Sequence, residues 1–310
     1  MPTIVTITFN PCIDKSTTVE SLLPDKKLYC LDFKNEAGGG GINVAKALKH
    51  LGSNNSLAVY LAGGYTGVIL NSLLQQEKIK AKIINTDVDT RENIMITDKT
   101  SNLQYRFITQ GNPVNEIHWR KCLQVIEGVK NVKYLVVSGS MQTGYPQDIF
   151  ILLANMARQK GARLVIDVPG KTIQAYPIKK AYLLKPNLNE LSLFSGREEL
   201  QGDDIIKAAK DIIFKNISEV VVVSMGAAGA LLVTHDTTEQ FMAPPVKRKS
   251  TVGAGDSMVA GIVQYLSSQK SISEAVRFGI ACGTAATMNE GSRLCSRSDV
   301  DNLYNSMIMG

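Results

Sequence analysis

Short apolar runs alternate with amphipathic segments along most of the chain. Runs typical of strands lie at residues 3–9, 57–61, 134–138, 163–167, 182–185 and 220–224. Segments with helical periodicity separate them, most clearly at residues 42–51, 147–160 and 203–215. This order predicts an α/β fold with a mostly parallel sheet, covered by helices on both faces. Sheets of this kind bind their ligands at the carboxyl ends of the strands.

Two regions depart from this order. Residues 28–34, and the pair 93–98 and 104–108 around a polar turn, have strand-like patterns with no helix between them. We expect a small antiparallel β lid, formed by about residues 12–36 and 91–109, on a single α/β domain of residues 1–310. Such a lid leaves one apolar face uncovered, so it should close over a substrate or pair with a second copy in a homodimer.

Composition and charge exclude several classes of protein. No run approaches the roughly 20 apolar residues that span a bilayer, and residues 2–9 alternate like a strand, so we expect a soluble, cytoplasmic protein without membrane partners. The net charge is +6, but the densest basic cluster is only residues 247–249 and aromatics are 6% of the chain. Nucleic acid is therefore not expected, and small anionic substrates fit best. Five scattered cysteines indicate buried thiols rather than a zinc site.

The glycine-rich segment at residues 250–256 is the strongest candidate for chemistry. It directly precedes an amphipathic run at 257–266, so Gly253 and Gly255 lie where N–H groups at a helix N-terminus bind an anion. Asp256, in the first helical turn, is placed to accept the proton of a hydroxyl that attacks a phosphoryl group. A helix cap made by this aspartate explains the segment about equally well.

A second glycine-rich segment, residues 37–48, contains four consecutive glycines before a helical pattern. Ordering them costs considerable chain entropy, which close approach of the backbone to a ligand would explain. The segment matches neither the P-loop nor the dinucleotide fingerprint. Binding of a polyol by glycine N–H groups and Asn43 fits, and a flexible hinge is the alternative.

Three further segments are each ambiguous alone. Lys185, Asn187 and Glu190 follow a strand, where the spacing suits a capping box, but Lys185 and Asn187 are also placed to meet nucleotide phosphates while Glu190 holds a hydrated Mg²⁺. Residues 224–229 have the pattern of a plain glycine turn. Asp14 lies just beyond the first strand, where it would hold sugar hydroxyls or form an Asx turn.

Together these segments resemble the PfkB (ribokinase-like) family of carbohydrate kinases. That family pairs a G-G-x-x-x-N-x-A segment with a late G-A-G-D segment, and both are present here in the family's order. The resemblance covers nearly the whole chain and implies a ribokinase-like three-layer α/β/α fold with a β lid. It also implies ATP-dependent phosphorylation of a sugar, with Asp256 as base and the amides of Gly253, Ala254 and Gly255 as an anion hole.

Within the family, residues 244–247, 250–258 and 288–296 are most similar to the kinases of fructose 6-phosphate. By this resemblance the sugar phosphate contacts Asp14, Gly39, Gly40, Asn43, Ser140, Lys27, Arg91 and Arg106. ATP contacts Lys185, Asn187, Ser224, Gly226, Gly229, Thr251 and Thr284. Glu190 lies near Mg²⁺, and K⁺ is enclosed by Ser250, Val252, Ala286, Asn289, Gly291 and Arg293.

Several alternatives stay open from the sequence. Tyr29 stands where the resemblance leads us to expect an arginine, two residues after Lys27, so recognition of the phosphate is expected to differ. Fructose 1-phosphate and tagatose 6-phosphate are the nearest rival substrates, because pocket details rather than motifs separate such isomers. A sugar-phosphate sensor that lost catalysis is a further alternative. A dinucleotide oxidoreductase is disfavoured, since no G-x-G-x-x-G follows the first strand.

Overall fold

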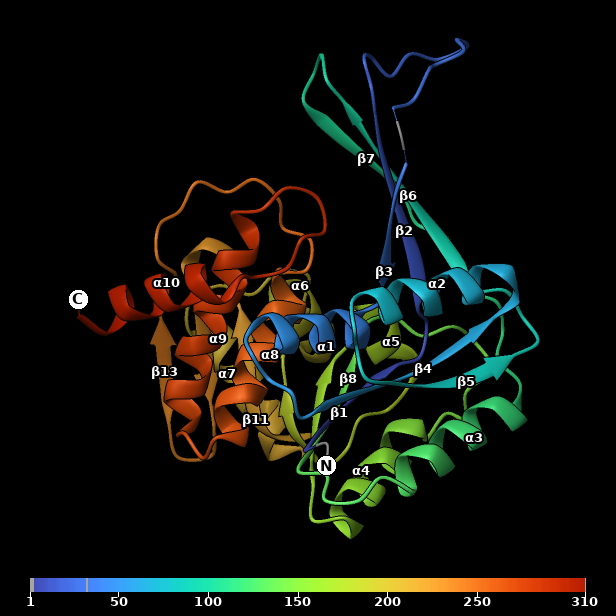
Figure 1. The fold of residues 1–310 in the computed structure, drawn as a ribbon. Coiled ribbons are helices and arrows are strands. Elements are labelled where there is room, and N and C mark those ends of the chain that lie inside the picture. The colour runs from blue at the N-terminus through green and yellow to red at the C-terminus, as the bar shows by residue number, and fades with distance from the viewer. Residues whose placement is uncertain (1–2, 32, 310) are drawn as a thin grey trace.

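A large twisted sheet runs through the body of the protein (Figure 1). The computed structural model describes residues 3–31 and 33–309, and within them nine strands form this sheet. Their order across the sheet is β13 (Thr238–Phe241), β12 (Ala230–Val233), β11 (Ser218–Ser224), β10 (Ala181–Leu184), β9 (Arg163–Asp167), β8 (Tyr134–Ser138), β1 (Ile4–Thr8), β4 (Ser56–Gly63) and β5 (Ala81–Thr86).

The strands pair in parallel except at one edge, where β12 runs antiparallel to both β11 and β13. The register of β8 with β9 pairs Ser138 with Asp167, so these two strands end side by side. The predicted mostly parallel sheet is confirmed. Its carboxyl edge at β1, β8, β9 and β10 carries the residues of the site described below.

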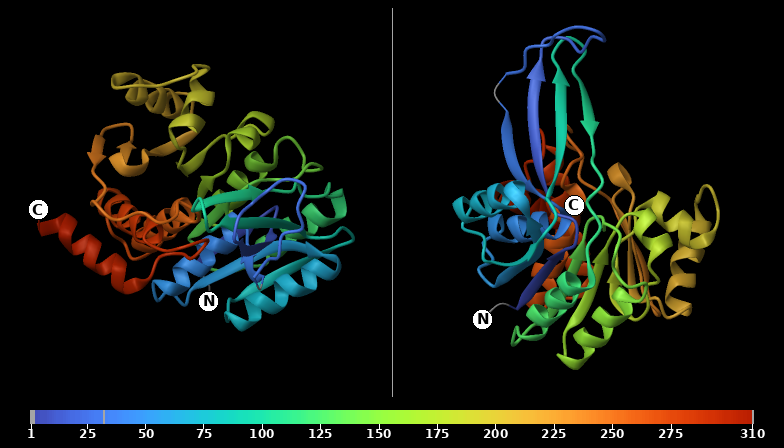
Figure 2. Two further views of the ribbon diagram at one scale, coloured as in Figure 1. Left: turned by 90° about the horizontal axis from the view of Figure 1, so that it is seen from above. Right: turned by 90° about the vertical axis from the view of Figure 1, so that its right-hand side faces the viewer.

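Helices cover both faces of the sheet, as the alternating pattern predicts (Figure 2). One face packs against α1 (Gly40–His50), α2 (Gly64–Gln76), α8 (Ala254–Ser267), α9 (Ile272–Thr287) and α10 (Arg297–Met309). The other packs against α3 (Glu116–Glu127), α4 (Ile149–Gln159), α5 (Gly170–Ala175), α6 (Leu188–Ser195) and α7 (Asp203–Phe214). In β1, Val5 and Ile7 join one hydrophobic cluster and Ile4 joins the other, so both faces of the strand are buried.

A second sheet forms the lid and projects from the carboxyl edge of the main sheet (Figures 1 and 2). Its order is β3 (Lys34–Gly38), β2 (Cys12–Val19), β6 (Arg91–Asp98) and β7 (Leu103–Phe107). The expectation of purely antiparallel pairing is wrong at its centre, where β2 and β6 pair in parallel. The reason is that both strands leave the main sheet in the same direction, β2 after β1 and β6 after β5.

The first lid strand lies elsewhere than predicted. Residues 28–34 form no strand over their described length, apart from Lys34, where β3 begins. Their apolar side chains Leu31 and Phe33 are exposed. The lid position between β3 and β6 is taken by β2 instead. The actual strand β2 escaped prediction since its residues include Asp14, Lys15 and Ser16, which break the apolar alternation.

One face of the lid is apolar and uncovered in the single chain. On this face Ile94 and Ile96 of β6 pair with Phe107 and Tyr105 of β7. Leu103, at the start of β7, continues the same line of side chains. Phe107 is 52% exposed and Leu103 is 56% exposed. The predicted uncovered apolar face is therefore present. We call these five residues the apolar lid face.

The lid is not basic as a whole. Residues 12–36 and 91–109 contain seven basic side chains, Lys15, Lys26, Lys27, Lys34, Arg91, Lys99 and Arg106, and seven acidic ones, Asp14, Glu20, Asp25, Asp32, Glu36, Glu92 and Asp98. Lys15 pairs with Glu92 at 2.7 Å and Lys34 pairs with Glu36 at 2.9 Å. These two segments of the sequence therefore carry no net charge.

The apolarity of the helices and the burial of the cysteines bear on two predictions made from composition. Among the described residues, no helix is both long enough and apolar enough to cross a membrane. Cys12, Cys122, Cys282 and Cys295 are buried, as expected for small apolar side chains. The prediction is wrong for Cys30, which lies in the lid and is exposed.

Candidate active site

Asp256 lies at the start of α8, and its side chain does not cap that helix. The N-cap residue is Gly253, with a left-handed φ of 74°, so no side chain at the N-cap position accepts a hydrogen bond from the first turn. Instead, Asn43 Nδ2 donates to Asp256 Oδ2 at 2.9 Å and Ser138 Oγ donates to Oδ1 at 2.9 Å. The carboxylate therefore points at the beginning of α1 and the end of β8, and the helix-cap alternative is wrong.

The charges around Asp256 tune its basicity. Burial raises the pKa of its carboxyl, and the Asp167 carboxylate raises it further, to about 6. The hydrogen bonds from Asn43 and Ser138, and the Lys185 ammonium, act in the opposite direction. A carboxyl with a pKa of about 6 is mostly ionised at neutral pH, yet its carboxylate is a stronger base than that of an ordinary aspartate.

Lys185 and Asp167 form an ion pair beside Asp256, with Nζ and Oδ1 3.0 Å apart. Burial lowers the pKa of Lys185, but Asp167, with smaller contributions from Glu190 and Asp256, raises it, and the pKa is raised overall. Lys185 is thus a permanent cation near the first turn of α8. Sequence reasoning identified Lys185 but missed Asp167 and Ser138. Their position as the last residues of β9 and β8 was the available signal, because ligands bind at carboxyl ends of parallel strands.

The four glycines of residues 38–41 run between Asp256 and the base of the lid, and they are tightly packed. A Cβ on Gly40 would lie 2.4 Å from Ser138 Oγ, and one on Gly41 would lie 2.4 Å from the carbonyl oxygen of Ile7. Gly39 adopts a φ of 111°, which disfavours other residues. The flexible-hinge alternative is wrong, because these glycines let α1 pack directly against β1 and β8.

Polar groups at the base of the lid form the second half of this region. Asp14 belongs to β2 rather than to an Asx turn, and its Oδ1 accepts a hydrogen bond from Asn93 Nδ2 at 2.8 Å. Cys12 Sγ lies 3.4 Å from the same oxygen. Asn93 and Cys12 were not predicted as site residues. A Cβ on Gly38 would lie 2.2 Å from Asp14 Oδ2, so the glycine segment contacts Asp14 directly.

Arg91 and Ser140 lie together next to this group. Arg91 donates from Nη2 to the carbonyl oxygen of Asn10 at 3.2 Å and approaches Ser140 Oγ at 3.5 Å. Asn10 Nδ2 also donates to Ser140 Oγ at 3.2 Å. The structure therefore gathers the predicted sugar-binding residues Asp14, Gly39, Gly40, Asn43, Arg91 and Ser140 around the start of α1 and the base of the lid.

A cavity of about 820 Å³ opens on the other side of the α8 N-terminus. It is lined by all seven residues expected to bind ATP, Lys185, Asn187, Ser224, Gly226, Gly229, Thr251 and Thr284, together with Ala254 and Gly255. Its remaining wall is largely apolar and includes Pro244, Val246, Met258 and Ile280. An apolar wall opposite a helix N-terminus and a lysine suits a nucleotide, whose base is flat and whose phosphates are anionic.

Residues 224–229 serve as both a turn and a cavity wall. The predicted glycine turn is confirmed as a short 3₁₀ turn, Gly226–Ala228, between β11 and β12. Gly229 has a φ of 88°, and a Cβ there would lie 1.9 Å from the carbonyl oxygen of Phe241. Ser224 lies beside Asn187, to which it is joined by an isolated parallel bridge.

The predicted capping box at the start of α6 is confirmed. Asn187 Oδ1 accepts from the Glu190 N–H at 2.9 Å, and Glu190 Oε2 accepts from the Asn187 N–H at 2.9 Å. Burial raises the pKa of Glu190, and nearby Asp167 acts in the same direction. Two carboxylates held close together repel each other, and a divalent cation between them relieves this repulsion. Glu190 and Asp167 therefore fit Mg²⁺ carried by a nucleotide. Among the described residues, no group of three or more His, Cys, Asp and Glu side chains forms a protein-only metal site.

The residues expected around K⁺ come together near the N-terminus of α8. Ser250 Oγ donates to the carbonyl oxygen of Gly291 at 2.7 Å and accepts from the Val252 N–H at 3.2 Å. The Asn289 N–H donates to the carbonyl oxygen of Ala286 at 3.2 Å. Hydroxyl and carbonyl oxygens are hard ligands, so this donor set fits an alkali cation. Arg293 lies in the same turn and is exposed.

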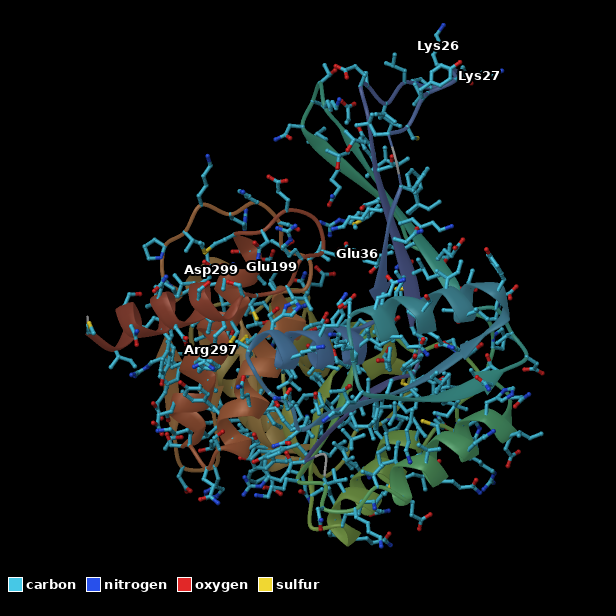
Figure 3. The ribbon with its side chains drawn as sticks, viewed as in Figure 1. Lys26, Lys27, Glu36, Glu199, Arg297 and Asp299 are labelled. Carbon is cyan, nitrogen blue, oxygen red and sulfur yellow. The ribbon has the colours of Figure 1, made fainter. Side chains whose placement is uncertain are left out.

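Lys27 lies far from the rest of the predicted site. It extends from the tip of the lid, at the end remote from Asp14 and α1 (Figure 3). Arg106 is exposed on β7, opposite Met95, and its Nε donates to Gln104 Oε1 at 2.9 Å. The structure therefore brings Arg91, but not Lys27, to the other residues predicted to bind the sugar.

Comparisons with known proteins agree with this geometry. The model of the pfkB family of carbohydrate kinases matches residues 6–299. ATP-dependent 6-phosphofructokinase isozyme 2 of Escherichia coli strain K12 is 40% identical over 305 residues, 98% of this chain and 98% of that enzyme. The 1-phosphofructokinase of Bacillus subtilis strain 168 is 30% identical over 292 residues, 93% of each chain.

Solved structures give the same fold. Phosphofructokinase-2 from Escherichia coli in complex with potassium matches with a TM-score of 0.93 and 40% identity, covering 99% of this chain and 100% of that chain. The same enzyme with fructose-6-phosphate matches with a TM-score of 0.89 and 38% identity over the same shares. A ribokinase from Thermotoga maritima, at 20% identity, shares the fold with a TM-score of 0.74 over 100% of each chain. The predicted ribokinase-like fold is confirmed.

Proposed function

The chain belongs to the pfkB family of carbohydrate kinases, and we propose that this ATP-dependent sugar kinase phosphorylates the 1-hydroxyl of fructose 6-phosphate. The relative that is 40% identical over nearly its whole length is a 6-phosphofructokinase, which supports this acceptor. The product would be fructose 1,6-bisphosphate, formed in glycolysis. One observation carries the proposal. Asp256 lies between the polar groups at the base of the lid and the nucleotide-sized cavity, where a base between two substrates must be.

The chemistry assigns each group a simple task. The oxygen of the 1-hydroxyl bonds to the γ-phosphorus as the bond from that phosphorus to the β–γ bridging oxygen breaks, and ADP leaves. The hydroxyl proton passes to the Asp256 carboxylate. The amides of Gly253, Ala254 and Gly255, at the positive end of α8, stabilise negative charge on the transferred group. Lys185 adds a full positive charge from the cavity side.

Sugar and nucleotide are held by different elements. We assign the sugar hydroxyls to Asp14, Asn43, Ser140 and the amides of Gly39 and Gly40, with Arg91 near the phosphate. ATP takes the cavity lined by Asn187, Ser224, Gly226, Gly229, Thr251 and Thr284. Because the two sites meet only at the α8 N-terminus, the hydroxyl and the γ-phosphoryl group approach each other there.

Two cations complete the proposal. Glu190, with Asp167 beside it, would hold hydrated Mg²⁺, which neutralises charge on the nucleotide phosphates. Ser250, Val252, Ala286, Asn289, Gly291 and Arg293 would enclose K⁺, and the potassium complex of the related enzyme supports this site. In this chain these residues fix the loop that leads into Gly253.

We assign Lys27 to the site of a second subunit. A chain whose apolar lid face is uncovered gains by pairing that face with the same face of another copy, which yields a homodimer. In such a pair the tip of each lid extends toward the other subunit, and the partner's Lys27 would then approach the substrate phosphate. Arg106 would line the approach on the lid, while Tyr29 adds no charge where we expected an arginine.

Fructose 1-phosphate is the second candidate acceptor, since a relative that is 30% identical is a 1-phosphofructokinase. Tagatose 6-phosphate, an isomer at one carbon, is the third. Measuring ADP release with fructose 6-phosphate, fructose 1-phosphate, tagatose 6-phosphate and ribose, with and without K⁺, tests the choice. We expect the highest kcat/KM for fructose 6-phosphate. A higher kcat/KM for either isomer reassigns the substrate. Thermal stabilisation by a sugar phosphate, with no ADP formed from ATP in the presence of any of the sugars, indicates a sensor instead.

A further inference from the structure

Ser138 holds one oxygen of the proposed base, although no motif contains it. Its Oγ donates to Asp256 Oδ1 at 2.9 Å, and its residue is 2% exposed. We propose that Ser138 is a positioning residue, which fixes the plane of the Asp256 carboxylate for proton acceptance. This inference rests on the proposed function, because it takes Asp256 to be the base.

The backbone of Ser138 is rigidly held. Ser138 ends β8, which lies between β1 and β9 inside the main sheet, and it pairs in register with Asp167. Beyond it, the Gly139 N–H donates to the carbonyl oxygen of Asp167 at 2.9 Å. A hydroxyl on such a strand has little positional freedom, so it can fix a neighbouring side chain precisely enough for proton transfer.

The glycine at position 40 leaves space for this hydroxyl. A Cβ on Gly40 would lie 2.4 Å from Ser138 Oγ, closer than any normal contact. Gly40 starts α1, the same helix that carries Asn43. The helix that supplies one hydrogen bond to Asp256 therefore also packs against the residue that supplies the other.

The two hydrogen bonds differ in their relation to the substrate. Asn43 is partly exposed and is assigned to the sugar hydroxyls, so it must share Asp256 Oδ2 with the incoming hydroxyl. Ser138 is shielded from the site and keeps Oδ1 in place during this exchange. The terminal torsion of an aspartate is soft. Without Ser138, the carboxylate is free to turn about that torsion as the substrate arrives.

The hydroxyl also acts on the charge of the base. Among the described residues, the groups that face Asp256 are Asp167 from β9, Lys185 after β10, Asn43 from α1, Ser138 from β8 and the Cys12 thiol from β2. Burial and Asp167 favour the protonated carboxyl, whereas Ser138 donates to the ionised form and favours it. Losing this donor should raise the pH at which the enzyme becomes active. A serine with only a packing role would not move that pH.

The test compares Ser138→Ala with Ser138→Cys and with a control. Ser218→Ala removes an equally buried serine, 2% exposed, at the opposite end of the same sheet, where its Oγ donates to the carbonyl oxygen of Val220 at 2.8 Å. For Ser138→Ala we expect kcat to fall about tenfold or more, as for a lost hydrogen bond to a charged group. The KM for the sugar phosphate should stay within about twofold. The acid limb of the pH profile should move up by about one unit.

The outcomes separate this inference from the proposed function. Ser138→Cys, a weak donor of similar size, should fall between wild type and Ser138→Ala, and it serves alone if the alanine variant does not fold. Unchanged kcat and pH profile in the folded variants would overturn the role of Ser138 while leaving Asp256 as base. Retention of turnover by Asp256→Asn would instead remove the premise. A shift equal to that of Ser218→Ala would reduce Ser138 to a packing residue.

Discussion

Replacing Asp256 by asparagine should slow phosphoryl transfer by about 10²–10⁴-fold and, at neutral pH, make the protein more stable. The pKa of this carboxyl rises from 3.8 to about 6 on folding, so the folded protein holds its proton more tightly than the unfolded chain. Between those values wild-type stability must fall as pH rises, because the folded state has to give up a proton that the unfolded state has already lost. Asparagine does not ionise and avoids this loss.

The magnitude follows from the shift and from the site. A shift of about two units corresponds to about 3 kcal/mol in the free energy of unfolding above pH 7. Asp256 is partly accessible, so solvent screening reduces the expected gain to about 1–2 kcal/mol. The substituted amide can still accept from Asn43 and can donate to Ser138 Oγ, so both hydrogen bonds survive in altered form. The Lys185–Asp167 pair remains balanced.

Thermal or urea denaturation at several pH values measures this gain. We expect the variant to melt about 2–4 °C above wild type at pH 8, since 1 kcal/mol shifts the melting temperature of a large domain by about 2 °C. The difference should shrink as the pH falls through 6 and vanish below about pH 3.8, where the carboxyl is protonated in both the folded and the unfolded state. Asp236→Asn, which removes an exposed carboxylate paired only with His235, is the matched control and should stay within about 0.5 kcal/mol of wild type. A loss of stability, or a gain that does not depend on pH, would show that the buried charge of Asp256 does not destabilise the folded protein.

Three further predictions concern the surroundings of the base. Gly40→Ala places a Cβ 2.4 Å from Ser138 Oγ and should destabilise the protein by about 1–3 kcal/mol, so a melting temperature equal to wild type would show that the packing can relax. Asp167→Asn removes the charge that raises the pKa of Asp256 and frees Lys185, so the acid limb of kcat/KM should move to lower pH; a move upward would contradict the assigned electrostatics. Phe107→Asp puts a charge on the apolar lid face and should shift the protein toward monomer in analytical ultracentrifugation, while the exposed Phe214→Asp on α7 should not; equal effects would argue against pairing through the lid.

Much of the main sheet could be predicted because its strands are buried on both faces. The apolar runs at residues 134–138 and 163–167 coincide with β8 and β9, since nothing polar interrupts them. The lid was predicted less well. Its strand β2 carries Asp14, Lys15 and Ser16, whose placement depends on partners in β3 and β6 far along the chain.

The residues of the site were likewise predictable only where they belong to a local sequence pattern. Asp256 and Asn43 belong to recognisable glycine-rich segments, and the structure joins them by a hydrogen bond across 213 positions. Ser138 and Asp167 stand in ordinary strands, and only the register of β8 with β9 brings them to the base. Sequence patterns do not contain that register. For Lys27 the sequence predicted a role in the site. The lid extends so far that this residue lies away from the other predicted site residues of its own chain (Figure 3).

The proposed role of Asp256 is to accept the proton as phosphate passes from ATP to the 1-hydroxyl of fructose 6-phosphate. A single-turnover measurement with γ-labelled ATP, wild-type protein and Asp256→Asn tests it directly. We predict that the label appears on carbon 1 of fructose 1,6-bisphosphate, and that the variant transfers it about 10²–10⁴ times more slowly while remaining folded. Transfer by the variant at a rate near that of wild type, or label on any other oxygen, would contradict the account.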